Sequence, residues 1–521
     1  MSSGKFNGPL VLIILDGYGL SPYNEGNAIA LAKKPVLDDL NKNYPHTELT
    51  ASGLKVGLPK NQRGNSEAGH MNLGAGRIAE QDVVIIDKAI KDGTFFKNSA
   101  FNSAISHVKA NDSQMHLFGL LTGEQSPHAE MEHLYALLDL LNKKEVKKVF
   151  LHIFTDGRDA PQRKALDFLN KLEKHFHGTE KVATVCGRFY GMDRNKLWER
   201  TEATYNMMTL GQGFKADNIK AAIFDAYDRM ETDEFIQPTV ITNGNGEPVT
   251  TINDNDSIIY YNLRSDRARQ LTKAIVQENF NDKNPGSFIR KKILHNICFV
   301  AMTDFGPDLD DILTAFPSHD FENTLPMVMK DYKQLYIAET EKYAHVTYFF
   351  NGGYDHPVAG EERRLIPSPK VKSYDEKPEM SAYQVTDSIL LDLQFKNTQL
   401  VVVNYCNPDM IGHTGNLPAA IKAIEVCDEC IGKIVKEVLA KQGVVMITAD
   451  HGNAETMVDI ESGEADTEHS NFPVPFILVS QSYQNAKLRN NGILGDVAPT
   501  ILQIFGIEKP AEMTGNSLII K

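Results

Sequence analysis

The sequence contains little tryptophan and cysteine and has no long apolar run. Its 521 residues include one Trp and five Cys, an odd and small number that does not suit the disulfide framework of a secreted protein. No apolar stretch approaches the roughly 18 residues that a membrane span requires. The run Leu10–Leu15 is also too short, and too soon followed by charge, for a secretion signal. We therefore expect a cytoplasmic protein that does not associate with membranes.

Positive charge is scarce as well. The chain has 54 Lys and Arg residues against 68 Asp and Glu residues, which gives a formal net charge of −14. This balance argues against a nucleic-acid partner. Hydrophobic residues at 42% and charged residues at 23% are ordinary for a globular protein. The length is sufficient for about three domains of average size.

Arginines nevertheless gather in the middle third of the chain. The planar guanidinium group binds phosphate and carboxylate oxygens in pairs, so this cluster predicts a small anionic ligand. Arg163 and Arg269 have polar or acidic neighbours in the sequence, and we expect them to form surface ion pairs instead. The other arginines of the cluster are Arg158, Arg188, Arg194, Arg264 and Arg267.

Two segments near the C-terminus each place a carboxylate close to an imidazole. Asp409 and His413 are four residues apart, so on a helix they would share one face and could reach one ion. Asp450 and His451 follow the apolar run 443–448, which is typical of a buried strand. In open α/β sheets, ligand sites lie at the carboxyl ends of the strands. Either pair alone also fits an ordinary surface loop, but together they indicate metal coordination.

The amino-terminal part adds a third carboxylate and a nucleophile. Asp16 follows the run Leu10–Leu15, although an Asp-Gly pair after a strand is usually only a turn. Ser66 lies in a glycine-rich segment whose backbone can approach a phosphate and whose serine can begin a helix. A serine hydroxyl needs a base or a metal ion to become a good nucleophile at neutral pH. With His469, these residues offer oxygen and nitrogen ligands for two ions.

Longer motifs add a family resemblance. From about Leu10 to its C-terminus the chain resembles the cofactor-independent phosphoglycerate mutases, a family of the alkaline phosphatase superfamily. The motifs occur in the family's order, and several are long enough to be specific alone. They are GNSEAGHMNLGAGR at 64–77, TDGRD at 155–159, GRFYGMDR at 187–194, NLRSDRARQL at 262–271, AETEKYAHVT at 338–347, PEMS at 378–381 and DHGNAE at 450–455.

The resemblance implies an isomerase that interconverts 3-phosphoglycerate and 2-phosphoglycerate in glycolysis and gluconeogenesis. It implies two Mn²⁺ ions, no bisphosphoglycerate, and Ser66 as the nucleophile that becomes phosphoserine. One ion would be held by Asp409, His413 and His469. The other ion would be held by Asp16, Ser66, Asp450 and His451. The residues implied to hold the phosphoglycerate or the transferring phosphoryl group are His128, Arg158, Asp159, Arg188, Arg194, Arg264, Arg267 and Lys342.

One loop departs from the family pattern. Where the family reads SDGGVHSH, residues 122–130 read TGEQSPHAE. The loop is therefore one residue longer, and Glu130 stands where the family has its second histidine. The difference concerns the contacts of the loop, including those of His128, and leaves the expected reaction unchanged.

The two ends of the chain must share one domain if these ligands meet. We expect a discontinuous α/β domain of alkaline-phosphatase-like fold, residues 1–80 and 318–521, which holds the metal ions. A second α/β domain, residues 81–317, would be inserted into it and would carry the substrate-binding arginines. Apolar runs alternate with helical patterns in both parts, which predicts mostly parallel sheets flanked by helices.

Other functions are compatible with the same core. A phosphatase of this superfamily would use the same metals and Ser66 but release phosphate, and a phosphopentomutase would carry a different inserted domain. A non-catalytic metal-binding protein is the third alternative. The ligand atoms also suit Mg²⁺, Co²⁺ or Zn²⁺, so the choice of Mn²⁺ depends on the resemblance. We expect a monomer whose only partner is a small-molecule phosphoglycerate.

Overall fold

The computed structural model describes residues 6, 8–123, 126–306, 308–309, 312–317, 320–460 and 462–520. The chain forms two compact units. Unit 1 comprises Met1–Val84 and His319–Lys521, and unit 2 comprises Ile85–Ser318. The divisions fall after residues 84 and 318, whereas the sequence suggested boundaries after 80 and 317. Residues 318 and 319 themselves lie outside the described part of the chain.

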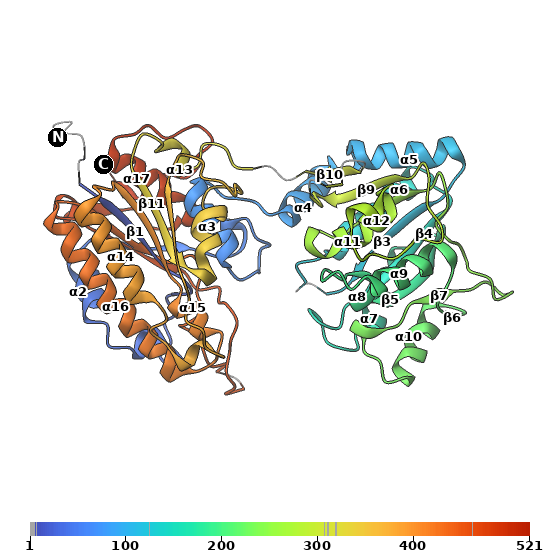
Figure 1. Ribbon diagram of the computed structural model, residues 1–521, viewed down its shortest axis with the longest axis horizontal. Helices are drawn as coiled ribbons and strands as arrows, with labels where there is room; N and C mark the ends of the chain where they lie inside the picture. Colours follow the sequence, from blue (N-terminus) through green and yellow to red (C-terminus); the bar gives the residue numbers. More distant parts are fainter. Residues whose placement is uncertain are drawn as a thin grey trace. The chain divides into compact units, whose positions relative to one another are not determined.

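Unit 1 is built on an eight-stranded sheet (Figure 1). Its central strand β1 is wholly apolar and fully buried, which is typical of a parallel strand covered on both faces. Strand β1 pairs in parallel with β13 and β14, and β15 runs antiparallel to both of its neighbours. In spatial order the strands are β12 (Glu362–Ile366), β11 (Gln334–Glu339), β13 (Leu400–Tyr405), β1 (Leu10–Leu15), β14 (Val444–Thr448), β15 (Val474–Val479), β2 (His46–Thr50) and β17 (Gly492–Ile493). A separate small sheet pairs β16 (Lys487–Leu488) with β18 (Ile519–Ile520).

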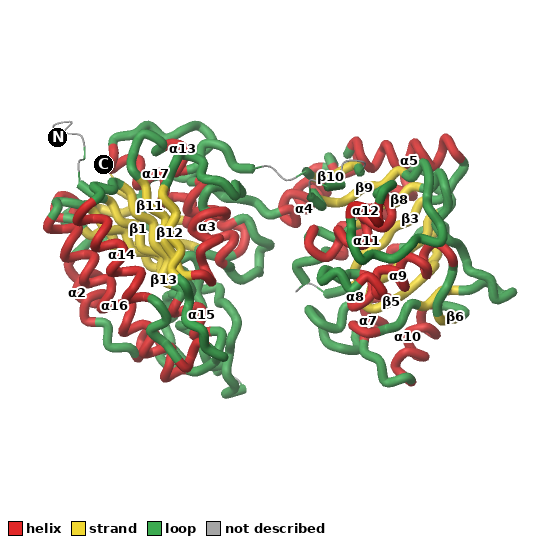
Figure 2. Tube along the Cα trace, in the orientation of Figure 1, coloured by secondary structure: helices red, strands yellow, loops and turns green. Residues whose placement is uncertain are grey.

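The helices of unit 1 pack in two groups around this sheet (Figure 2). The long helix α16 packs against α1, α2, α14 and α15, whereas α3 packs against α13 and α17. Asn416 caps the start of α16, where its side chain accepts a hydrogen bond from the Ala419 amide. The bounds are α1 (Ala28–Leu31), α2 (Pro35–Asn43), α3 (Ser66–Ala75), α13 (Leu325–Val328), α14 (Ala382–Phe395), α15 (Asn407–Gly412), α16 (Leu417–Ala440) and α17 (Val497–Phe505).

Unit 2 contains a second eight-stranded sheet, in which only the β5–β7 pair of the described strands is antiparallel. Its central strands β3 and β4 are mostly apolar and almost entirely buried, and each contains one buried histidine, His116 or His152. In spatial order the strands are β10 (Leu313–Phe316), β9 (Cys298–Thr303), β8 (Ser257–Tyr260), β3 (Met115–Leu121), β4 (Val149–Thr155), β5 (Glu180–Gly187), β7 (Thr239–Ile241) and β6 (Phe214–Ala216). The prediction of α/β architecture with mostly parallel sheets is confirmed for both units.

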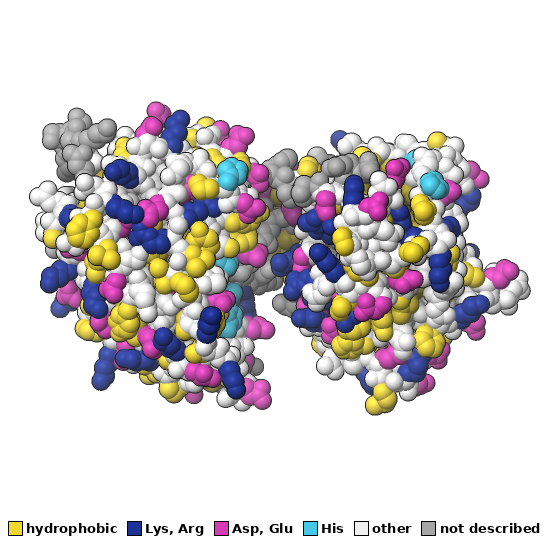
Figure 3. All heavy atoms as spheres, in the orientation of Figure 1, with side chains coloured by type: hydrophobic (Ala, Val, Ile, Leu, Met, Phe, Trp, Pro, Cys, Tyr) yellow, Lys and Arg dark blue, Asp and Glu magenta, His cyan; other side chains and the backbone are white. Residues whose placement is uncertain are grey.

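Helices also surround the sheet of unit 2 (Figure 2). They are α5 (Ser99–Asn111), α6 (Met131–Lys143), α7 (Ala165–Leu172), α8 (Arg188–Gly191), α9 (Trp198–Leu210), α10 (Ile219–Asp228), α11 (Ser265–Val276) and α12 (Phe280–Lys283), and α4 (Asp82–Asp92) contains the first division between the units. Side chains of both charge signs are interspersed on the visible face of each unit (Figure 3). Among the helices of the described residues, none combines the length and the apolar character needed to cross a bilayer.

Candidate active site

The carboxyl ends of four neighbouring parallel strands, β11, β13, β1 and β14, lie at one edge of the unit 1 sheet. The register brings them level, since Leu15 pairs with Tyr405 and Ile14 pairs with Thr448. Each of these strands is followed either by a polar residue or by a short turn that contains one. This edge therefore gathers Asp16, Lys342, Asp409, Asp450 and His451.

The glycine-rich segment delivers Ser66 to the same place. Helix α3 begins at Ser66, and the side chain of Asn65 caps it by accepting a hydrogen bond from the Ala68 amide at 2.9 Å. Gly69 allows α3 to pack closely against the turn after β14, because a Cβ at this position would lie only 2.7 Å from the Cβ of Asp450. The expected helix start at Ser66 is confirmed.

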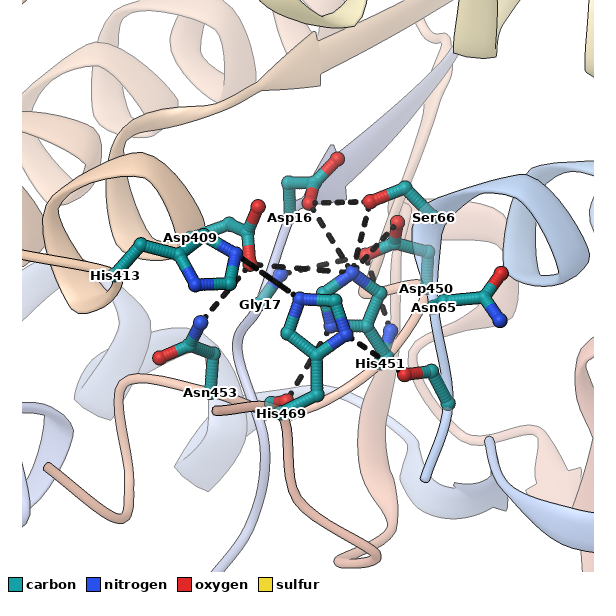
Figure 4. A network of polar contacts seen from close by, with 12 residues as sticks. Asp16, Gly17, Asn65, Ser66, Asp409, His413, Asp450, His451, Asn453 and His469 are labelled. Carbon is teal, nitrogen blue, oxygen red and sulfur yellow. Dashed lines mark hydrogen bonds and ion pairs between the residues drawn. The ribbon is translucent and has the colours of Figure 1, made fainter. Parts of the chain in front are cut away.

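Three charged or ionisable groups surround the Ser66 hydroxyl, and two of them, Asp16 and His451, are drawn beside it in Figure 4. Lys342 donates to Ser66 Oγ at 2.6 Å, and His451 Nε2 lies 2.9 Å from the same oxygen. Ser66 in turn donates to Asp16 Oδ1 at 3.2 Å. The serine is buried to about the same degree as its partners. Its hydroxyl therefore lies in a desolvated, strongly polar environment.

A second cluster is centred on Asp409. Its Oδ1 lies 3.3 Å from His413 Nε2 and 3.2 Å from His469 Nε2. The other ring nitrogens are already occupied, since His413 Nδ1 is 2.8 Å from the Thr467 carbonyl and His469 Nδ1 is 2.8 Å from the Gly64 carbonyl.

A carbonyl can only accept, so in both rings the proton lies on Nδ1. When both rings are neutral, the two Nε2 atoms, 3.1 Å apart, direct their lone pairs toward the same space beside Asp409 (Figure 4). Metal-binding histidines commonly donate their second N–H to a carbonyl in this way.

The electrostatics of the site are dominated by three buried carboxylates, Asp16, Asp409 and Asp450. Burial opposes ionisation of Asp16 and Asp409, but Lys342 and the neighbouring imidazoles outweigh it and hold the pKa of both carboxyls below the ordinary value. Burial likewise disfavours the charged form of His451, but the three carboxylates around it prevail and raise its pKa to about 9.

These residues fit a divalent cation. The Lys342 ammonium contacts two of the three carboxylates, and Asp450 Oδ2 is buried without a hydrogen bond, so the cluster has spare acceptor capacity. Two sets of ligand atoms each lie within 4.8 Å of one another: Asp409 with His451 and His469, and Asp16 with His70 and Asp450. The resemblance instead groups His451 with Asp16. The Nε2 atom of His451 lies between the two aspartates, 3.4 Å from Asp16 Oδ1 and 4.0 Å from Asp409 Oδ1.

Three buried polar residues of this site did not emerge from the sequence as candidates. His70 and Asn404 contact the Asp16 and Asp450 side, and Asn453 donates to Asp409 Oδ1 at 3.1 Å. His70 left a signal, because it follows Ser66 by four residues and so shares its face of a helix, and Asn453 lies in the motif at 450–455.

Seven of the eight residues implied in substrate binding lie in unit 2, whereas Lys342 lies in unit 1 beside Ser66. Arg188 is buried, and its Nη1 donates to both Asp156 and Asp159 at 2.6 Å, while its Nε makes no hydrogen bond. Asp156 also accepts from the amides of Arg158 and Asp159, so it organises the turn after β4.

The remaining arginines of unit 2 are more exposed. Arg194 donates to Asp266 at 2.6 Å, and Arg264 Nε lies 3.8 Å from the same carboxylate. Arg267 donates to the Met192 carbonyl, and Arg158 lies 3.6 Å from Glu234. Of the two arginines expected in surface ion pairs, Arg269 pairs with Asp308, whereas Arg163 lies over the ring of Tyr227.

The altered loop contacts this arginine cluster. Ser126 donates to Asp159 at 2.9 Å, and His128 Nε2 lies 4.0 Å from the same carboxylate. Burial and the nearby Arg188 lower the pKa of His128 to about 4, so the ring is neutral at pH 7. Glu130 is half-buried at the start of α6, and burial raises its pKa. Residues 124 and 125 of the loop lie outside the described part of the chain.

Known proteins resemble this chain along its whole length. A family model described as the metalloenzyme superfamily matches residues 8–509. The 2,3-bisphosphoglycerate-independent phosphoglycerate mutase of Clostridium acetobutylicum is 51% identical over 514 residues, which cover 98% of this chain and 99% of that protein. The enzyme of the same name from Clostridium novyi is 50% identical with the same coverage.

A solved structure supports the same assignment. Phosphoglycerate mutase of Leishmania mexicana, determined at low cobalt concentration, matches with a TM-score of 0.71 and 27% identity over 100% of this chain and 99% of that one. Sequence and fold thus agree over essentially the full length. The chain belongs to the metalloenzyme superfamily and, within it, to the 2,3-bisphosphoglycerate-independent phosphoglycerate mutases, a family of isomerases.

Proposed function

We propose that this chain interconverts 3-phosphoglycerate and 2-phosphoglycerate, with Ser66 as the nucleophile and phosphoserine as the intermediate. The observation that carries the proposal is the environment of Ser66, whose hydroxyl is held between Lys342, His451 and Asp16 at the start of α3. Family membership supports the reaction and its substrate.

The protein groups around Ser66 favour its ionised form. The Lys342 ammonium donates to Oγ and so stabilises negative charge on it, while the hydroxyl proton points at Asp16 Oδ1. Oγ then attacks phosphorus, the bond from phosphorus to the substrate oxygen breaks and that oxygen takes up the proton given up by Ser66, so glycerate remains with the phosphoserine. The phosphoryl group on Ser66 would lie at the N-terminus of α3, where free amides and the helix dipole stabilise anions.

Two divalent ions complete the site in this proposal. Asp409, His413 and His469 would hold one ion, and Asp16, Ser66, Asp450 and His451 would hold the other. Such ions supply positive charge that lowers the pKa of the serine hydroxyl and neutralises phosphoryl oxygens. Mn²⁺ is our choice because of the family resemblance, since carboxylate oxygens and imidazole nitrogens also suit Mg²⁺, Co²⁺ or Zn²⁺.

Unit 2 would hold the glycerate part of the substrate. His128, Arg158, Asp159, Arg188, Arg194, Arg264 and Arg267 are our candidates for this role. Arg188 supports it best, because two carboxylates fix its Nη1 in the interior. Retention of glycerate lets its other hydroxyl attack the phosphoserine, which yields the isomer and restores Ser66. The same retention separates a mutase from a phosphatase.

Phosphorus NMR tests the proposal directly. Purified chain, 3-phosphoglycerate and Mn²⁺ are incubated without bisphosphoglycerate, next to a chelated sample and a Ser66→Ala sample. We expect a 2-phosphoglycerate signal that depends on both the metal and Ser66. Inorganic phosphate in its place would identify a phosphatase, and an unchanged spectrum would direct the search to pentose phosphates.

A further inference from the structure

His70 is fully buried beside the candidate metal cluster, yet the mechanism above does not use it. It lies one turn after Ser66 on α3. Its Nδ1 is 2.9 Å from the Ser66 carbonyl and 3.2 Å from Asp450 Oδ2. Its Nε2 is 3.0 Å from Asn404 Nδ2. Both ring nitrogens therefore have polar neighbours.

The neighbours of His70 fix its tautomer. Asn404 Nδ2 also donates to Asp16 Oδ2 at 2.6 Å, and the reversed amide would place its oxygen against this carboxylate. The amide N–H group is thus the donor, and His70 Nε2 must accept from it. The ring proton therefore lies on Nδ1, which donates to the Ser66 carbonyl and turns its positive edge toward Asp450.

This arrangement links three parts of the site. Through Asn404, His70 connects to Asp16 at the end of β1, and through Nδ1 it connects to Asp450 after β14. Its bond to the Ser66 carbonyl also fixes the first residue of α3. Rotation of the ring would disturb two candidate ligands and the nucleophile together.

We propose that His70, acting with Asn404, is a positioning residue that orients Asp16, Asp450 and Ser66 for the ion they share, and that it is not itself a ligand. The inference rests on the proposed metal site. The competing role is direct coordination, since His70 belongs to a set of ligand atoms within 4.8 Å. Coordination through either ring nitrogen would require His70 to give up one of its two hydrogen bonds.

Mn²⁺ binding separates these roles without any use of activity. Metal-free full-length protein is titrated with Mn²⁺, and the free ion is counted by electron paramagnetic resonance. We compare wild type with His70→Ala and Asn404→Leu. Loss of an outer-shell partner typically weakens metal binding about 10- to 100-fold. We expect both variants to bind as many ions as wild type, with one dissociation constant raised by about this factor.

His116→Ala is the matched control. His116 is also fully buried and pairs with an aspartate, Asp256, at 3.1 Å, but it belongs to unit 2. It reports the effect of removing a buried His–Asp contact in general, and its Mn²⁺ affinity should equal that of wild type. Thermal unfolding of each metal-free variant shows that it is folded, and Asn404→Leu carries the test if His70→Ala does not fold.

Two outcomes would overturn the inference. Loss of one whole ion in His70→Ala, with Asn404→Leu unchanged, would make His70 a ligand. Unchanged affinity in both variants would mean that the pair does not act on the metal site. Failure of the proposed function would look different, because wild type itself would then bind no Mn²⁺ or produce no 2-phosphoglycerate.

Discussion

Lys342 Nζ lies 2.6 Å from Ser66 Oγ, and the same ammonium contacts the carboxylates of Asp16 and Asp409 at 2.8 and 2.7 Å. In the metal-free chain, Lys342 is therefore the internal counterion of the site. Burial alone would lower the pKa of this lysine, but the three carboxylates of the site outweigh burial and raise it. A bound divalent ion would share this role.

Replacement of Lys342 by methionine should therefore destabilise the metal-free protein more than the metal-bound protein. Removing one partner of a buried ion pair typically costs about 3–5 kcal/mol. We expect a loss of this size in the free energy of unfolding without metal and a smaller loss with saturating Mn²⁺, measured by denaturant titration. Lys396→Met, which removes an exposed lysine paired with Glu362, is the control. Equal losses with and without Mn²⁺ would contradict the counterion role.

Ser66→Ala should abolish turnover and preserve the fold. Loss of a nucleophile typically lowers kcat by several orders of magnitude, at least about 10³-fold. The measurement is the phosphorus NMR assay, and the control is Ser257→Ala, which removes a buried hydroxyl from unit 2. A Ser66→Ala variant with more than about a tenth of wild-type activity would refute the nucleophile assignment.

Asp409→Asn should weaken one metal site selectively. The side chain keeps its shape but loses the charge that faces His413 and His469. We expect Mn²⁺ titration to show one weakened and one nearly unchanged site. Asp92→Asn, which removes an exposed carboxylate of unit 2, should bind Mn²⁺ as wild type does. If Asp409→Asn bound two ions with wild-type affinity, Asp409 would not be a ligand.

Metal binding should release protons in a defined pH range. The pKa of His451 is raised to about 9 in the metal-free chain, so its ring is charged at pH 7.5 and must lose its proton to bind an ion. Calorimetric titration in buffers of different ionisation enthalpy should detect release of at least one proton at pH 7.5 and progressively less above about pH 9. Release that did not change between pH 7.5 and pH 10 would exclude His451 as its source.

The same shift has a consequence for stability without metal. Because the pKa of His451 is higher in the folded state than in the unfolded state, its charged ring stabilises the fold. This contribution is complete at pH values below the ordinary pKa of 6.5, and it is lost as the pH rises through about 9.

Arg188→Lys should impair substrate binding more than the chemical step. The guanidinium of Arg188 is held by Asp156 and Asp159 through Nη1, and its other edge remains available to bind a ligand. A lysine keeps the charge but has no second edge of this kind. One lost charged hydrogen bond is worth about 1.5–3 kcal/mol, so KM for 3-phosphoglycerate should rise about 10- to 100-fold. Steady-state kinetics measure this, with the exposed Arg229→Lys as control. An unchanged KM would remove Arg188 from the substrate site.

The fold class was predictable because local patterns determine it. The run Leu10–Leu15 is apolar at every position, and such a run is typical of a strand covered on both faces. The antiparallel direction of β15 was not predictable, since Val474–Val479 has the same apolar character as the parallel strands β1 and β14. Strand direction depends on the connections, which leave no trace in composition.

The site was predictable where residues follow strand ends, as for Asp16 and Asp450. Lys342 had no such pattern, and its place beside Ser66 depends on the turn after β11. Asn404 lies inside the apolar strand β13 and appears in the sequence only as an interruption of it. Its partner Asp16 is 388 positions away, and a contact at this separation is visible only in three dimensions.

The central position of β1 also constrains how the protein is made. Leu10 pairs with Leu400 and Val444, so the first strand synthesised acquires its neighbours only near the end of translation. At ~5–20 residues per second, the ribosome takes about 20 to 90 seconds to cover this distance. During that interval unit 2 emerges complete, whereas an entirely apolar strand waits without a partner. Assembly of the metal-binding edge must therefore wait until β13 and β14 have been synthesised, and until then the apolar amino-terminal strand is exposed to aggregation.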